Sequence, residues 1–152
     1  MGSSWHDCDA SQLNLIDRVI AGFGPEDREQ FAVIQYCDLK GIQVFHVPNS
    51  TWTKSVMQKT KNRLLGVRSG IPDLFVLLPN VGTVAIELKR AKKKGISGTV
   101  STNQKVWIEL LNRIPGTDAH VCHGAQEAIK VIESYLHDQP IQKTRTVDTE
   151  PF

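Results

Sequence analysis

The sequence predicts an α/β domain in which helices flank a mixed β-sheet, with elements in the order αβββαβα. Short apolar runs typical of strands alternate with longer amphipathic segments typical of helices, and two of the apolar runs are joined by a short turn. The length of 152 residues suffices for one hydrophobic core. We therefore expect one folded domain over residues 26–137, an N-terminal extension over residues 1–25 and a disordered polar tail over residues 138–152.

The first predicted elements are a helix over residues 26–40 and a strand over residues 42–47. Pro25 suits the first turn of a helix, acidic residues follow it where the helix dipole favours them, and Gly41 is a typical stop. Residues 49–69 are polar and basic with little periodicity. We expect a long loop or a short irregular helix there.

The clearest predicted motif is a β-hairpin made of residues 73–79 and 83–89, two apolar runs separated by turn residues. We expect a three-residue turn over residues 80–82, with Gly82 in the left-handed conformation. A mobile loop and three regular elements are expected beyond the hairpin: the loop over residues 92–100, a helix over 102–114, a strand over 118–123 and a helix over 125–137.

Charged residues are strongly segregated along the chain, although the net charge is only +2. Residues 54–105 carry eleven basic side chains and two acidic ones, Asp73 and Glu87, whereas the segments on either side are net acidic. Cations for phosphate and carboxylates for a metal are what a phosphodiester-cleaving site requires. A solvated, lysine-rich surface would give the same pattern, so charge alone leaves both explanations open.

Composition argues against several other classes of protein. No apolar run approaches the length needed to cross a bilayer, and the N-terminus lacks the basic and then apolar pattern of a secretory signal. The cysteines, Cys8, Cys37 and Cys122, include no close pair, which disfavours a disulfide framework and a structural zinc site. We expect a reducing, intracellular compartment and no membrane partner.

Asp73, Glu87 and Lys89 are the residues most suggestive of chemistry. Glu87 and Lys89 lie two apart on a predicted strand and share one face, where a buried charge is costly unless it is paired or metal-bound. In the expected register Asp73 faces Lys89 and is a diagonal neighbour of Glu87. Two carboxylates can hold a hard divalent cation, and an ammonium can position water. A cross-strand Asp73–Lys89 salt bridge, with Glu87 as a bystander, explains the hairpin equally well.

The segment Gly-Ile-Pro-Asp73, followed after the hairpin turn by Ile-Glu87-Leu-Lys89, resembles the motif of the PD-(D/E)xK nucleases. More narrowly, it is similar to the pattern of the VRR-NUC family. The similarity extends over residues 29–135, which is most of the predicted domain. It implies a restriction-endonuclease-like core.

Two further positions match the pattern of that family, which has a helical Glu near the N-terminus and a Ser/Thr-x-x-Gln helix start after the Lys. They are Glu29 in the first predicted helix, and Gln104, three residues after Ser101. The resemblance implies that Glu29 is an outer or second metal ligand and that Gln104 supports Lys89 or a phosphate. Each has a structural explanation too. Glu29 could be a first-turn acid favoured by the helix dipole, and Ser101 with Gln104 could form a capping box, which does not conflict with a site role.

The resemblance implies a metal-dependent endonuclease. Asp73 and Glu87, together with the Leu88 carbonyl, would ligate Mg²⁺ or Mn²⁺, and Lys89 would assist the attacking water. Stand-alone members of the family imply a branched DNA substrate such as a Holliday junction or flap, and a homodimer. We expect pairing through apolar faces of the first or last helices, although the sequence does not identify the faces. The stand-alone members also imply the cytoplasm of a bacterium or phage-infected cell. The alternatives are a restriction-type or mismatch nuclease on the same core, and a non-cleaving DNA-binding module.

Basic side chains on either side of the motif are the expected phosphate contacts, although solubility alone would also explain them. They are Lys54, Lys59, Lys61, Arg63 and Arg68 before the motif and Arg90, Lys92, Lys93 and Lys94 after it. Trp52 lies among them and either stacks on a base or packs in the core. Trp107 is expected in the core. His46 and His123 are expected to be structural, because the expected mechanism needs no histidine.

Overall fold

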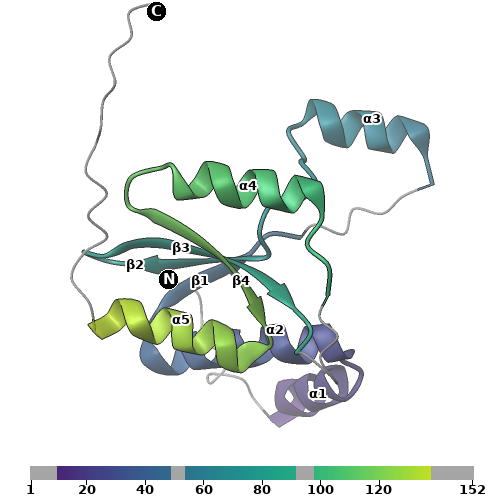
Figure 1. The fold of residues 1–152 in the computed structure, drawn as a ribbon. Helices are drawn as coiled ribbons and strands as arrows, with labels where there is room; N and C mark the ends of the chain where they lie inside the picture. The colour runs from purple at the N-terminus through teal and green to yellow at the C-terminus, as the bar shows by residue number, and fades with distance from the viewer. Residues whose placement is uncertain (1–9, 49–53, 92–97, 138–152) are drawn as a thin grey trace, which may run out of the picture.

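The computed structural model describes residues 10–48, 54–91 and 98–137 (Figure 1). The expected disordered tail, residues 138–152, and most of the expected mobile loop lie outside the described residues. The elements follow in the order α1 (Ala10–Ala21), α2 (Pro25–Lys40), β1 (Gln43–His46), α3 (Val56–Leu64), β2 (Leu74–Leu78), β3 (Gly82–Lys89), α4 (Thr102–Asn112), β4 (Thr117–His123) and α5 (Ala125–His137). Among the described helices, none combines the length and apolar character needed to span a membrane.

The predicted α/β class, a mixed sheet flanked by helices, is confirmed. The sheet has the order β1-β2-β3-β4, in which β1, β2 and β3 pair antiparallel while β3 and β4 pair parallel. The predicted element order lacks α1 and α3, which lie in the expected N-terminal extension and in the polar segment before the hairpin. Helix α1 was not predicted, although Leu13, Ile16 and Ile20 recur at helical spacing. Helix α3 lies where a long loop or a short irregular helix was expected.

Helices α2 and α5 cover one face of the sheet and α4 lies over the other (Figure 1). The core lies between the sheet and the α2–α5 layer, where alternate strand residues meet the apolar stripes of the two helices. Its fully buried members include Val33 and Cys37 of α2, Leu74 and Val76 of β2, Val84 and Ile86 of β3, Cys122 of β4, and Ala128 and Ile132 of α5.

Two of the three cysteines belong to this core. Cys37 and Cys122 are free and buried, and burial raises the pKa of their thiols to about 11 and about 12. Both are therefore protonated and unreactive at neutral pH. Cys8 lies outside the described residues.

The register of the β2–β3 hairpin differs from the expected one by two positions. Leu78 pairs with Gly82 and Leu74 with Ile86, and the left-handed turn residue is Asn80, with φ of 66°. The expected turn over residues 80–82 is wrong because Asn80, a residue type that takes the left-handed conformation more readily than most others, occupies that position of the turn. A shift of two keeps every side chain on its face, and the same pairing continued by one residue places Asp73 opposite Glu87.

The segment before β2 docks on the first turns of α4. The Asn103 side chain donates to Ser69 Oγ at 2.8 Å, and Trp107 Nε1 donates to the Ser69 carbonyl at 3.1 Å, which leaves Trp107 half-buried between the two segments. Gly70 has φ of 87°, and a Cβ there would lie 2.7 Å from the Asn103 backbone. Only glycine allows this approach, which fixes the chain just before Asp73.

We expect Gly70→Ala to destabilise the protein by roughly 2–5 kcal/mol, because left-handed strain and overpacking against α4 act together. Gly41→Ala is the matched control. Gly41 also has a left-handed φ, 67°, but an added Cβ meets nothing within 4 Å. Its cost should stay near the roughly 1–2 kcal/mol of conformational strain alone. Urea unfolding of both variants measures the difference, and equal losses would show that the contact with α4 is unimportant.

Candidate active site

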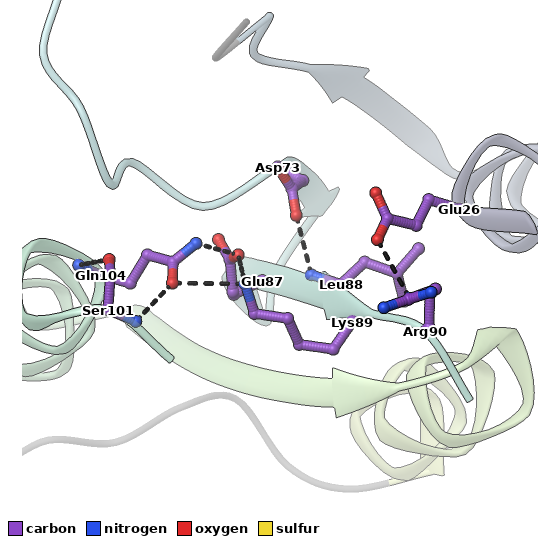
Figure 2. Close-up of polar contacts among 8 residues, drawn as sticks. All are labelled: Glu26, Asp73, Glu87, Leu88, Lys89, Arg90, Ser101 and Gln104. Atoms are coloured by element: carbon purple, nitrogen blue, oxygen red, sulfur yellow. Dashed lines mark hydrogen bonds and ion pairs between the residues drawn. The ribbon is translucent and has the colours of Figure 1, made fainter. Parts of the chain in front are cut away.

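Asp73, Glu87 and Lys89 come together where β2 begins and β3 ends (Figure 2). The Lys89 ammonium lies 2.8 Å from Glu87 Oε1, and Glu87 is only 2% exposed. Asp73 Oδ2 accepts a hydrogen bond from the backbone N–H of Leu88 at 2.9 Å. Lys89 therefore pairs with Glu87, so Glu87 is not the bystander of an Asp73–Lys89 bridge.

Gln104 joins this group from the first turn of α4. Its Oε1 accepts from Lys89 Nζ at 3.2 Å and from the Ser101 N–H at 2.8 Å, while its Nε2 donates to Glu87 Oε1. Ser101 Oγ in turn accepts from the Gln104 N–H. One side chain thus completes the capping box of α4 and contacts both charged residues of β3, so the two explanations of Gln104 hold together.

The two carboxylate oxygens of Glu87 have different surroundings. Oε1 takes the contacts with Lys89 and Gln104, whereas the buried Oε2 has no hydrogen-bond partner among the described residues. Burial raises the pKa of Glu87 above its ordinary value, and the nearby charge of Asp73 raises it further, against the opposing effect of Lys89 and Gln104. An unpartnered buried oxygen near a second carboxylate fits a hard divalent cation, for which both residues could supply oxygen ligands.

A cavity of about 230 Å³ opens beside this group. It is lined by residues of α2 together with the ends of the strands: Glu26, Asp27, Glu29, Gln30, His46, Asp73, Leu88 and Lys89. Asp73 and Lys89 therefore face a space that a ligand can enter, while Glu87 is buried next to it.

Glu29 lines the cavity from α2 and makes a defined contact. Its Oε2 accepts from the Ala125 N–H at 2.6 Å, at the positive N-terminal end of α5. The acids in the first turn of α2 are Glu26 and Asp27, so the explanation of Glu29 as a first-turn acid is wrong. Within the described part of the chain, no three His, Cys, Asp or Glu side chains form a group that could hold a metal ion. A metal role for Glu29 stays a proposal.

The basic side chains expected to contact phosphate lie mainly around α3, which projects from the domain (Figure 1). Lys59, Lys61 and Arg63 are exposed on α3. Lys54 and Arg68 flank this helix and are exposed too, and Arg68 donates to the carbonyls of Arg63 and Val67. Trp52, Lys92, Lys93 and Lys94 lie outside the described residues.

Arg90 pairs with Glu26, one of the residues that line the cavity, at 3.4 Å (Figure 2). Both side chains are mostly exposed, 65% and 75%, so the pair contributes little to stability and can exchange partners.

His46, which the sequence predicted to be structural, also lies in this region. It ends β1, lines the cavity, and its Nδ1 lies 2.9 Å from the Asp73 carbonyl oxygen. In the sequence, only its position at the end of a predicted strand, which could pair with the strand that follows Asp73, pointed to this place. His123, also expected to be structural, lies at the end of β4, where its ring and its N–H contact Glu127.

Comparison with known proteins gives one family. A family model described as "VRR-NUC domain" matches residues 27–126. A solved structure described as "VRR_NUC domain protein" is 23% identical, with a TM-score of 0.61 over 80% of this chain and 98% of its own. A second, described as "VRR_NUC domain", is 21% identical, with a TM-score of 0.52 over 74% and 99%. At these identities the structures show a common fold. No curated protein matches the chain.

We expect Glu87→Gln to remove a loss of stability with rising pH from the metal-free protein. Because the pKa of Glu87 is raised from 4.5, the folded state holds its proton to higher pH than the unfolded state. Wild-type stability therefore falls as pH rises through the window above 4.5, and the Gln variant lacks this loss. Thermal unfolding with EDTA from about pH 4 to pH 8 should give curves that diverge as pH rises. Parallel curves would show that burial does not raise the pKa of Glu87. Glu109→Gln, on the exposed side of α4, controls for the loss of a negative charge.

Proposed function

Because the chain belongs to the VRR-NUC domain family, whose domains are of nuclease type, we propose that it is a divalent-metal-dependent endonuclease that cuts branched DNA. Asp73, Glu87 and the Leu88 carbonyl would hold Mg²⁺ or Mn²⁺, and Glu29 would act as an outer ligand. The observation that carries the proposal is the unpartnered, buried Oε2 of Glu87 beside Asp73, within the described residues. A bound cation would satisfy this oxygen, polarise the scissile phosphate and acidify a water.

Lys89 has a role that follows from its surroundings. Its ammonium is held between Glu87 Oε1 and Gln104 Oε1 and is 17% exposed at the cavity. A cation fixed in this way can orient the attacking water by hydrogen bonding and offset negative charge that develops on the phosphate. Gln104 limits the positions that Lys89 can take, because its amide bridges Lys89 and Glu87. The charge of Lys89 is therefore placed before substrate arrives, which lowers the cost of reorganisation.

Substrate DNA would be held by the basic residues before the motif. Lys59, Lys61 and Arg63 extend from α3 into solvent, with Lys54 and Arg68 beside it, so several phosphates can be contacted at once. Arg90 would add a further phosphate contact after leaving Glu26. Lys92, Lys93 and Lys94 belong to the same proposal on sequence grounds alone.

Branched DNA is proposed together with a homodimer, since two sites related by a two-fold axis can cut two strands of a junction. Exposed apolar side chains support a second copy of the chain. They include Leu39 on α2 and Leu136 on α5, the first and last helices that were expected to pair. Leu15 and Val19 on α1 and Val106 and Leu110 on α4 are exposed as well. Exposed apolar side chains can form association surfaces when they are contiguous, and the oligomeric state in solution tests whether these do.

The test is cleavage of a labelled four-way junction and a flap with Mg²⁺ or Mn²⁺, with linear duplex and EDTA as controls. Metal-dependent cleavage of branched DNA but not duplex is the expected result. Cleavage of duplex at defined sequences would instead favour a restriction-type nuclease. Binding of the junction without cleavage would leave a DNA-binding module and refute the nuclease.

We expect Lys89→Ala and Asp73→Asn each to abolish cutting while largely sparing DNA binding. Asn keeps an oxygen that can accept from the Leu88 N–H, so Asp73→Asn removes charge with little change in structure. Product formation and gel-shift affinity in Ca²⁺ separate the two effects. Lys130→Ala, an exposed lysine on α5, is the matched control. Retained cleavage by either site variant would remove the proposed site.

Salt dependence tests the basic surface separately. Each phosphate contact contributes a slope of about −0.9 to the change of log K with log salt concentration. We expect the triple variant Lys59→Ala, Lys61→Ala and Arg63→Ala to bind more weakly and to flatten this slope by about 2–3. Fluorescence anisotropy between about 50 and 300 mM salt measures it. An unchanged slope would show that α3 is not the DNA surface.

A further inference from the structure

His46 contacts the main chain of Asp73 at the edge of the proposed site. Its Nδ1 lies 2.9 Å from the Asp73 carbonyl oxygen, and the backbone N–H of Val47 donates to the same oxygen, also at 2.9 Å. A carbonyl oxygen only accepts, so Nδ1 carries the proton in this contact. Both the neutral and the charged ring can supply that donor, so the contact does not depend on the charge of His46.

The contact lies at the end of the β1–β2 pairing, on a residue proposed to bind the metal. Regular pairing of β1 with β2 ends at His46 and Leu74, so Asp73 lies just outside the ladder, where strand ends open most easily. The bond from Val47 is one that a residue of any type other than proline could make. The bond from His46 depends on its side chain, which also lines the cavity beside Asp73.

Asp73 is thereby held from both neighbouring strands. β1 fixes its carbonyl through His46, and β3 fixes its carboxylate through the Leu88 N–H. Two carboxylates hold one ion well only if both are kept in place before the ion binds, because ordering them on binding costs affinity. Glu87 is kept in place by Lys89 and Gln104 from the opposite side.

We propose that His46 is a positioning residue that holds Asp73 in the orientation required for divalent metal binding. The expected effect on metal affinity rests on the proposed function. The contact between His46 and Asp73 does not. A histidine that only closed the end of a strand would change overall stability and leave the two carboxylates unaffected. The two roles therefore predict different measurements.

The matched variants are His46→Asn and His46→Leu. The Nδ2 of Asn is as many bonds from the backbone as the Nδ1 of His, so Asn can keep the hydrogen bond, whereas Leu has a similar size and no donor. Gln43→Ala, an exposed change on the same strand, controls for disturbance of β1. Circular dichroism first establishes that each variant is folded at the temperature of measurement.

Two measurements then test the positioning without any cleavage. We expect hydrogen exchange of the Leu88 amide, whose acceptor is Asp73 Oδ2, to be faster in His46→Leu and close to wild type in His46→Asn. We expect Mn²⁺ titration by electron paramagnetic resonance, without DNA, to give about 10–100-fold weaker binding for the Leu variant only.

Unchanged exchange and unchanged Mn²⁺ affinity in His46→Leu would overturn the proposal. Equal defects in the Leu and Asn variants would overturn it too, because the donor would then not matter. If the wild-type protein itself bound no Mn²⁺ and cut no DNA, the proposed function would fail. The exchange of the Leu88 amide would still decide whether His46 positions Asp73.

Discussion

The structure around the candidate site depends on how the buried charge of Glu87 is compensated. A carboxylate at 2% exposure is unfavourable by itself, and its pKa is raised for that reason. Lys89 and Gln104 compensate one of its two oxygens. The geometry of the neighbouring elements follows from this requirement, since Gln104 must start α4 close to β3, and Gly70 must let the chain before β2 pass against the same helix turn. The other oxygen, Oε2, has no hydrogen-bond partner among the described residues, which lowers stability. A bound cation could offset this loss.

The site is assembled from segments that are far apart in the chain but meet at one end of the sheet. The end of β3 supplies the buried acid and the ammonium, the segment before β2 supplies Asp73, and α4 supplies the amide (Figure 2). From the opposite side of the sheet, α2 brings Glu29 to the cavity, where the N-terminus of α5 holds it. Each of these contacts joins two elements of the fold. The same hydrogen bonds therefore stabilise the domain and place the residues of the candidate site.

Much of this could be predicted from the sequence, where the physical signal was local. The alternation of a strand places Glu87 and Lys89 on one face whatever the register, and the spacing of Ser101 and Gln104 defines a capping box. The register itself was not predictable, because Asn80 and Gly82 can both take the left-handed turn position. The contacts of Glu29 with α5 and of His46 with Asp73 arise between elements remote in sequence, so no local pattern encodes them. Helix α3 was also ambiguous, since its polar sequence has no buried stripe to give periodicity.

Helix α3 has a thermodynamic consequence for recognition. It has nine residues and no buried side chain, and helices shorter than about 12–15 residues are marginal in water unless tertiary packing supports them. Any partner that contacts α3 must therefore supply part of the free energy that orders it. Association through this helix would carry an unfavourable conformational entropy, so that a wide contact surface yields only moderate affinity and rapid release.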